Sequence, residues 1–484
     1  MKKTILILLL ASLICTFAAC GTTAENAGET TAATETEEAI ILNADFGGYE
    51  FKVLTSGCGG NYNDFDFEED SSKPLDRAQY ARKKKVESDF NINIIETAIS
   101  SGNTSGSGEG YRQIATAVSS GTCTYDLALI GGYDVTTLAY NGLLYDMNAI
   151  PSLDLTNSWW DQNANESLGI NGSVFYTAGE ISPSRADAAF CILFNKKIAN
   201  DYDIENPYDM VKNGTWTIEN FASLCKQVTE DLNSDGIMNG EDRYGLLVLD
   251  DSIVGIINAA GERCCETDEN GKITLTIYND TTVSALDKFF NIALDTQYAL
   301  SYQRIQSGRE YEDYLWTGDH GLFWTSYMKM VPRYRDMESD FGILPYPKFS
   351  ETQDDYYSTI FPYISQFICI PAIQNDTART AVITEALGYY GEQIVKPAYY
   401  DVSLKGQAAR DAESLEMLDI IFGNLVYDVG YYHQIGPYNK QLIYMMREGD
   451  SSFTTRYETY RTAAETQINQ INNAYDAVTK MWSK

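Results

Sequence analysis

The fold of this 484-residue chain is decided by the stretch Tyr125-Asp126-Leu127-Ala128-Leu129-Ile130-Gly131-Gly132. Four successive apolar residues that end at a glycine pair are typical of a strand buried on both faces. Before it, the pattern predicts strands at 49–54 and 91–96 and helices at 75–90 and 111–119. This alternation predicts an α/β fold in which a mainly parallel sheet is covered by helices on both faces. Ligands of such sheets bind beyond the carboxyl ends of the strands.

After this stretch, strands and helices continue to alternate. A second βα unit is expected near 174–176, and residues 191–197 read as a strand that ends where a helix begins. Thr217 is the expected N-cap of a helix that runs to Val228. We predict the remaining strands at 273–278, 319–324 and 341–347, followed by a largely helical C-terminal third.

Charge and composition exclude several classes of function. The chain has 68 Asp and Glu against 35 Lys and Arg, a formal charge of −33, so its surface repels nucleic acid. Only two histidines occur, His320 and His433, which nearly excludes histidine triads and metal centres with several histidines. The 35 tyrosines, 19 phenylalanines and 6 tryptophans indicate stacking surfaces rather than acid–base chemistry.

The N-terminus predicts export and a lipid anchor. Met1-Lys2-Lys3 precedes an apolar run at 5–14, an order that is typical of a secretory signal. The following Phe17-Ala18-Ala19-Cys20 resembles a bacterial lipobox, although Phe17 stands where the motif usually has Leu. We therefore expect removal of 1–19 and lipidation of Cys20, at the outer face of the cytoplasmic membrane; an ordinary signal peptide is the alternative. Residues 20–44, rich in Thr, Ala and Glu, read as a flexible tether.

Seven further cysteines predict no disulfide framework, because their number is odd and no pair has CxxC spacing. We expect most of them to be small buried apolar residues. They are Cys58, Cys123, Cys191, Cys225, Cys264, Cys265 and Cys369.

Six motifs, in this order, resemble the lipid-anchored extracellular solute-binding proteins of ABC importers, in particular Gram-positive members of the broad family with the sugar-binding receptors. They are Trp159-Trp160-Asp161, Phe194-Asn195-Lys196-Lys197, Thr215-Trp216-Thr217, Asp231-x-Asn233-x-Asp235-Gly236, Phe341-Gly342-Ile343-Leu344-Pro345-Tyr346-Pro347 and Ala408-Ala409-Arg410-Asp411. The resemblance covers nearly the whole chain after the tether.

The resemblance implies a type II periplasmic-binding-protein-like fold with two discontinuous lobes joined by a hinge. On this basis we assign 45–152 plus 305–350 to the first lobe and 153–304 plus 351–484 to the second. It further implies a monomeric receptor, not an enzyme, that closes on a solute, preferably a carbohydrate or oligosaccharide, and delivers it to permease subunits.

Candidate ligand-binding residues are aromatic and polar side chains near strand ends and chain crossings. Aromatic faces pack on the apolar faces of sugar rings, and polar side chains bind hydroxyl groups. The candidates are Trp159, Trp160, Tyr133, Asp134, Trp324, Tyr327, Arg185, Asp187 and Asp64. Structural roles stay open for them: a core position for one of the two tryptophans, a surface salt bridge for Arg185 and Asp187, and a solvated acidic run for Asp64.

Residues 231–242 have the spacing of an EF-hand calcium loop, with glycine at position 6. The expected ligands of a structural Ca²⁺ are Asp231, Asn233, Asp235, the carbonyl of Ile237, Asn239 and Asp242. The alternative is an acidic turn without metal. A dockerin is dismissed because the loop occurs once and in mid-chain.

Two other functions stay open. A receptor of the same architecture could bind a peptide or another polar solute. A secreted polysaccharide-active enzyme is the third possibility, since the many carboxylate pairs do not exclude a glycosidase pair. No nucleophile–base arrangement in the sequence supports catalysis.

Overall fold

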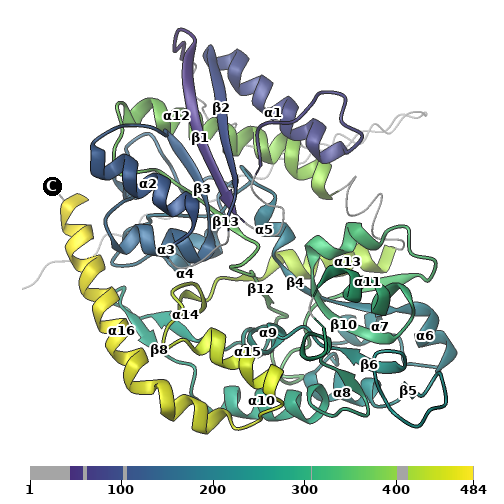
Figure 1. Cartoon of the computed structure of the whole chain (residues 1–484). Helices are drawn as coiled ribbons and strands as arrows, with labels where there is room; N and C mark the ends of the chain where they lie inside the picture. Colours follow the sequence, from purple (N-terminus) through teal and green to yellow (C-terminus); the bar gives the residue numbers. More distant parts are fainter. Residues whose placement is uncertain (1–43, 58–62, 102–105, 307, 401–411, 483–484) are drawn as a thin grey trace, which may run out of the picture. The chain divides into compact units, whose positions relative to one another are not determined.

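Two β-sheets organise the chain in the computed structural model, which describes residues 44–57, 63–101, 106–306, 308–400 and 412–482 (Figure 1). These residues belong to one compact unit. The first sheet has the order β13 (Gln366–Cys369), β3 (Leu127–Gly131), β1 (Tyr49–Gly57) and β2 (Ile92–Ser100). Strands β2 and β3 are parallel to β1, and β13 is antiparallel to β3.

The second sheet is mixed rather than mainly parallel. Its order is β11 (Phe341–Leu344), β4 (Phe190–Asn195), β10 (Gly321–Tyr327), β6 (Arg243–Leu247) and β5 (Thr229–Glu230), with β9 (Ala299–Leu300) also on β6. Strand β10 is antiparallel to β4 and parallel to β6. Two small ladders complete the strands: β12 (Ser358–Thr359) with β14 (Leu425–Val426), and β7 (Cys265–Thr267) with β8 (Ile273–Leu275).

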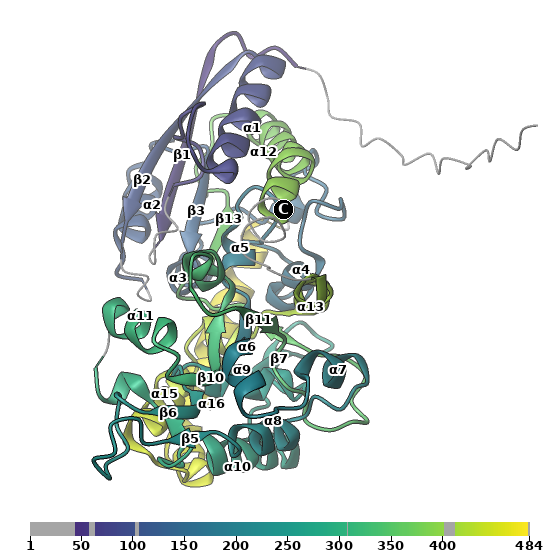
Figure 2. The same cartoon turned by 90° about the vertical axis from the view of Figure 1, so that its right-hand side faces the viewer.

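Helices cover both sheets. Those near the first sheet are α1 (Pro74–Phe90), α2 (Glu109–Ser120), α3 (Gly132–Tyr140), α4 (Gln162–Leu168) and α12 (Thr377–Tyr390). Figures 1 and 2 show α1 and α12 side by side on one face of this sheet, with α2 and α3 on the other. Near the second sheet lie α6 (Lys196–Asp201), α7 (Pro207–Lys212), α8 (Ile218–Cys225), α9 (Ser252–Ala259), α10 (Asp280–Ala293), α11 (Arg309–Thr317) and α13 (Ala412–Gly423).

The other helical segments lie at the crossings and at the C-terminus. They are η1 (Met147–Ala149), α5 (Ser184–Asp187), η2 (Tyr302–Arg304), η3 (Met328–Tyr334), η4 (Gly391–Val395), α14 (Val429–Tyr432), α15 (Tyr438–Glu448) and α16 (Phe453–Trp482). Helix α16 packs against both α3 and α10, so it connects the layers of the two sheets. None of the helices in the described ranges is long and apolar enough to cross a membrane.

Local sequence signals place the element boundaries. Helix α2 ends at Gly121, whose φ of 67° belongs to the left-handed region that favours glycine. The Thr217 hydroxyl accepts a hydrogen bond from the amide of Asn220 (3.3 Å) and caps α8, as the sequence predicts. Asn195 caps α6 in the same way, so β4 ends where this helix begins.

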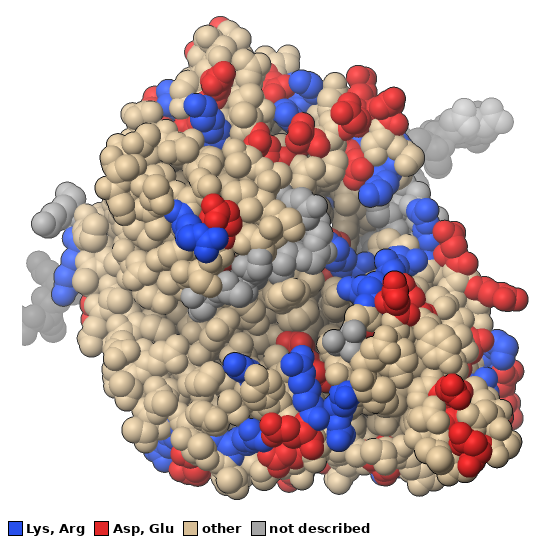
Figure 3. All heavy atoms as spheres, in the orientation of Figure 1, with Lys and Arg blue, Asp and Glu red and all other residues tan. Residues whose placement is uncertain are grey.

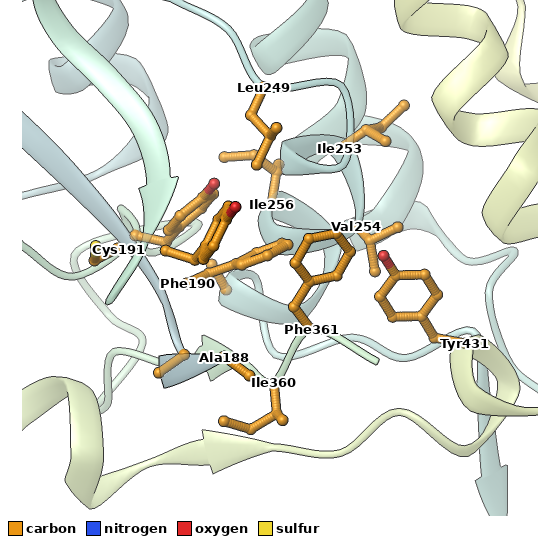
Figure 4. Packing of buried hydrophobic residues seen from close by; sticks show 14 of the residues in the cluster. Ala188, Phe190, Cys191, Leu249, Ile253, Val254, Ile256, Ile360, Phe361 and Tyr431 are labelled. Atoms are coloured by element: carbon orange, nitrogen blue, oxygen red, sulfur yellow. The ribbon is translucent and has the colours of Figure 1, made fainter. Parts of the chain in front are cut away.

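The hydrophobic core continues beneath the crossings. The ring of Phe190, on β4, lies 5.2 Å from that of Phe361 and 5.7 Å from that of Tyr346. Figure 4 shows Phe190 and Phe361 beside Val254 and Ile256 of α9. This packing fixes the start of β4 and the return crossing near 360 against one another.

Five of the six described cysteines are buried and Cys123 is partly buried, which confirms the expected apolar role for most of them.

Two sequence-based assignments are wrong in the structure. No strand forms at 174–176, where Thr177 makes only an isolated bridge to Ile368. The lobe boundaries also differ from the sequence-based ones. Strands β10 and β11, within 305–350, pair with β4 in the second sheet and not in the first lobe. Strand β13, within 351–484, pairs with β3 in the first sheet and not in the second lobe. An apolar strand pattern shows that a strand is buried, but not which sheet edge it joins.

Candidate functional site

A cavity of about 840 Å³ lies between the two sheets. Its walls come from five parts of the chain: the loop after β1 with the first turns of α1, the α5 region, η3 with the residues after it, Gln366 at the start of β13, and Tyr399. We call this cavity the cleft. The space-filling view shows a hollow in the face of Figure 1, with Lys and Arg side chains gathered beside it (Figure 3).

Asp64 is held at the first-sheet wall of the cleft. Glu96, on β2, shapes its loop by accepting hydrogen bonds from the amides of Asp64 (2.8 Å) and Phe65 (3.0 Å). The Gln79 side chain donates to the Asp64 carboxylate (3.0 Å), and Arg82 donates to the Asp64 carbonyl (2.6 Å). Asp64 is 3% exposed and lines the cleft, so the acidic run that contains it is not simply solvated.

The pKa of the Asp64 carboxyl is raised to about 7, mainly by burial and next by the charge of Glu96, while Arg82 opposes the rise. A hydrogen bond with the Ser182 hydroxyl also lowers this pKa, and repulsion from Asp187, likewise on the cleft, adds a smaller increase. The folded chain therefore holds this proton more tightly than the unfolded chain does.

From this shift we predict a pH dependence of stability. Between about pH 4 and pH 7 the unfolding free energy should fall as pH rises, by at most about 4 kcal/mol, because the folded state binds the proton more tightly. In Asp64→Asn this contribution should vanish. Denaturant unfolding across this range measures it, with the exposed Asp66→Asn as the matched control. Equal pH slopes in wild type and Asp64→Asn would contradict the prediction.

Gln366 is the most unusual side chain on the cleft. It is 3% exposed, and within the described part of the chain neither its side-chain amide nitrogen nor its side-chain amide oxygen has a hydrogen-bond partner. The backbone of Gln366 is fixed by the pairing of β13 and by Ser184, whose hydroxyl accepts a hydrogen bond from the backbone amide of Gln366 (3.2 Å). A buried polar group without partners is costly, so a hydrogen-bonding group that entered the cleft beside Gln366 would relieve this cost.

Gln366 is not among the ligand-binding residues predicted from the sequence, although the sequence pattern around it contains a signal. It is the one polar side chain in the buried run Gln366-Phe367-Ile368-Cys369-Ile370. A lone amide in an otherwise apolar strand is a reason to look for a ligand there.

Arg185 and Asp187 face different surroundings although both lie on α5. Asp187 lines the cleft, accepts a hydrogen bond from the Tyr399 hydroxyl (2.9 Å) and lies 3.6 Å from the Lys329 ammonium. Arg185 instead forms ion pairs with Asp161 (3.2 Å) and with Glu180. Both α5 side chains thus form ion pairs, that of Asp187 on the cleft wall and those of Arg185 away from it.

Arg185 lines a separate cavity of about 450 Å³, which we call the second hollow. Its other walls come from the end of η4 and the end of α13. Three residues, Ser182, Pro183 and Tyr399, line both the cleft and the second hollow. The two cavities therefore meet along one edge.

The family profile described as bacterial extracellular solute-binding protein matches residues 84–367, which is more than half of the chain. The chain belongs to the bacterial extracellular solute-binding proteins. No curated protein matches the sequence at a significant level.

Solved structures resemble this solute-binding protein in fold. An ABC substrate-binding protein from Listeria monocytogenes in complex with cycloalternan is 14% identical, with a TM-score of 0.53 over 90% of this chain and 99% of that one. A solute-binding protein from Thermotoga lettingae bound to α-D-tagatose is 15% identical, with a TM-score of 0.54 over 87% and 100%. The cyclic α-maltosyl-1,6-maltose binding protein of Arthrobacter globiformis is 13% identical, with a TM-score of 0.56 over 89% and 99%. These likenesses confirm the type II two-lobed α/β fold.

Trp159 and Trp160 do not form an exposed platform in the solute-binding protein. They are 4% and 2% exposed, and both indole nitrogens donate to the carboxylate of Glu385 on α12, at 2.6 and 3.3 Å. The Trp159 ring also packs edge-on against Tyr389 (5.6 Å). The prediction that this pair offers a stacking face is wrong in this structure, because α12 covers both rings.

Trp324 and Tyr327, on β10, also lie off the described cleft wall. Trp324 is 2% exposed and packs between Trp316 (5.5 Å) and Tyr334 (5.6 Å) in the core of the second sheet. The Tyr327 hydroxyl accepts a hydrogen bond from Arg309 (3.2 Å). Because β10 joins the second sheet rather than the first, its aromatic side chains are directed into that core.

Tyr133 and Asp134 begin α3, directly after β3, as expected, but neither is part of the described cleft wall. The Tyr133 ring packs edge-on against Tyr431 (6.2 Å). Asp134 is 3% exposed and accepts hydrogen bonds from the amides of Gly106 (2.9 Å) and Gly108 (3.4 Å). Its carboxylate thus anchors the loop before α2.

Cys20, Cys58 and the motif at 408–411 lie outside the described residues.

The predicted calcium loop has the backbone of a tight acidic turn. Gly236, at position 6, has a φ of 80°, and its amide donates to the Asp231 carboxylate (2.8 Å). The carboxylate of Asp242 is fully buried and accepts hydrogen bonds from the amides of Leu232 (3.0 Å) and Asn239 (2.8 Å). Within the described ranges, no three His, Cys, Asp or Glu side chains are grouped so as to hold a metal ion. Calcium binding stays a prediction.

Proposed function

We propose that this protein is the substrate-binding component of an ABC importer and binds a carbohydrate, preferably an oligosaccharide, in the cleft. The observation that carries the proposal is the buried side-chain amide of Gln366, a cleft-lining residue, whose donor and acceptor both lack partners among the described residues. A sugar hydroxyl donates and accepts, so two neighbouring hydroxyls would satisfy both ends of this amide. Asp64, Asp187 and Ser182, which also line the cleft, would supply further hydrogen bonds.

The structures with the same fold add support for this ligand class. The three named above were solved or described with cycloalternan, α-D-tagatose and cyclic α-maltosyl-1,6-maltose, all of which are carbohydrates. In this proposal the cleft closes around the sugar without changing it, and the closed form is offered to the permease subunits.

Lipid anchoring belongs to the same proposal. The signal-like residues 1–19 and the lipobox-like Cys20 support an anchored receptor at the outer face of the cytoplasmic membrane, tethered through 20–44. The proposed receptor acts as a monomer. No catalytic step forms part of the proposed function.

Calorimetry with the purified, unlipidated protein tests the ligand class. The panel contains monosaccharides, the α-1,4-linked and β-1,4-linked oligosaccharides of two to six units, and tri- to pentapeptides. Saturable binding of a saccharide that leaves it chemically intact supports the proposal. Saturable binding of peptides alone, or release of reducing sugar by the protein, would overturn it.

We further propose that the 231–242 loop binds a structural Ca²⁺. The loop's carboxylate, amide and carbonyl oxygens are the donors that Ca²⁺ prefers, and Gly236 has the backbone conformation that the turn requires. Its residues Asp231, Asn233, Asp235, Asn239 and Asp242, with the Ile237 carbonyl, would hold the ion.

For this loop we predict a calcium-dependent gain in stability. At a calcium concentration one hundred times the dissociation constant, the unfolding free energy should rise by about 2.7 kcal/mol, because the folded state alone binds the ion. Asp235→Ala should abolish the rise. The matched control is Asp268→Ala, which removes another turn aspartate that accepts bonds from backbone amides. Thermal unfolding in calcium and in EDTA measures the effect, and an equal shift in Asp235→Ala would disprove the site.

A further inference from the structure

The second hollow differs from the cleft in its chemistry. Tyr400 and Phe422 are half-buried, and their ring centroids lie 5.0 Å apart. They line the hollow together with Val395. The cleft, in contrast, is lined mainly by polar and charged side chains. Partly exposed rings at the wall of a cavity are suited to stacking on the apolar faces of sugar rings.

The basic groups in the second hollow are already paired. Arg185 forms ion pairs with Asp161 and Glu180, and the Lys396 ammonium lies 3.2 Å from Glu180 and 3.5 Å from Glu392. The basic wall of this cavity therefore offers little uncompensated charge to an ionic ligand. A neutral ring system fits it better than a charged group does.

The two cavities meet along an edge formed by Ser182, Pro183 and Tyr399. Tyr399 is 4% exposed, and its hydroxyl bond to Asp187 (2.9 Å) holds it in place. Helix α5 contributes side chains to both cavities: Asp187 lines the cleft, and Arg185 lines the second hollow. A ligand long enough to cross this edge would contact both walls.

We propose that the solute is an extended saccharide, with one end hydrogen-bonded in the cleft at Gln366 and its next units stacked on Tyr400 and Phe422 in the second hollow. This inference rests on the proposed carbohydrate function and specifies the length of the ligand. The cleft volume of about 840 Å³ lies within the usual range for one small ligand, so the added 450 Å³ of the second hollow extends the site beyond it.

Calorimetry with saccharides of increasing length tests the inference. The probes are the α-1,4-linked series from maltose to maltohexaose and the β-1,4-linked series from cellobiose to cellohexaose. In the series that binds, affinity should rise about tenfold between the disaccharide and the tetrasaccharide, as one additional ring contact would give. Phe422→Ala should remove this rise and leave the affinity for the disaccharide within about twofold.

The matched control is Tyr278→Ala. Tyr278 is 42% exposed and its ring also lies close to another, that of Tyr457 (4.4 Å), but it lines neither cavity. This variant should keep the full dependence on length. Thermal unfolding of each variant shows that it is folded before binding is compared.

The outcomes separate the two proposals. A saccharide that binds with the same affinity at every length would overturn the extended site and leave the carbohydrate function intact. So would a Phe422→Ala variant that keeps the wild-type rise, or one that loses affinity equally for short and long probes. Wild-type protein that binds no saccharide would overturn the carbohydrate function itself.

Discussion

Gln366→Leu is expected to bind the saccharide about 10- to 100-fold more weakly than the wild type and yet to unfold at higher denaturant concentration. The side-chain amide of Gln366 is buried and has no hydrogen-bond partner among the residues that the structure describes. Leucine of similar size removes this unsatisfied group, so the unfolding free energy should rise by about 1–2 kcal/mol. The same change removes the donor and acceptor proposed to bind hydroxyl groups. Calorimetry and denaturant unfolding measure the two effects.

Gln79→Leu is the matched control for this opposite pair of effects. Gln79 is also 3% exposed and also lines the cleft, but its side chain donates to Asp64 (3.0 Å). Its replacement should lower the unfolding free energy by about 1 kcal/mol or more, since Asp64 loses a donor. A Gln366→Leu variant that is less stable and binds the saccharide normally would show that Gln366 supports the fold instead of the ligand.

Trp159→Ala is expected to have the largest effect on stability, a loss of about 3–5 kcal/mol. The Trp159 ring is buried against α12, and its indole nitrogen donates to Glu385 (2.6 Å). The truncation leaves a cavity and takes one of the donors from a buried carboxylate. Denaturant unfolding measures the loss.

Trp159→Phe separates a role in packing from a role in binding. It keeps a ring against α12 and loses only the indole donor, so we expect a folded protein, destabilised by about 1–3 kcal/mol, with unchanged affinity for the saccharide. A large loss of affinity with little loss of stability would restore Trp159 as a ligand platform and contradict the structural placement.

The sequence predicted the first sheet well because its signals are local. The apolar run of β3 and the helical spacing of α1 appear in the structure at almost the predicted boundaries. Gly121 ends α2, and Thr217 and Asn195 cap α8 and α6. Each of these depends on residues a few positions apart, so one stretch of sequence is sufficient to read it.

The candidate site was predicted only in part. Asp64 and Asp187 line the cleft, and strand ends or chain crossings had indicated both. The aromatic candidates do not line the cleft. Composition shows that aromatic rings are abundant, but it does not show which helix covers each ring. The Trp159–Trp160 pair is covered by α12, more than 200 residues further along the chain.

The amino-acid sequence by itself determined the alternating α/β elements, the acidic charge, the signals for export and the acidic loop at 231–242. Tertiary structure alone decided that β10 and β11 join the second sheet, that β13 returns to the first, and that Gln366 lines the cleft with a side chain that has no partner among the described residues. The physical reason is the distance along the sequence over which each interaction acts. Helix caps and apolar periodicity act over a few residues, whereas sheet pairing and burial depend on which distant segments the folded chain brings together.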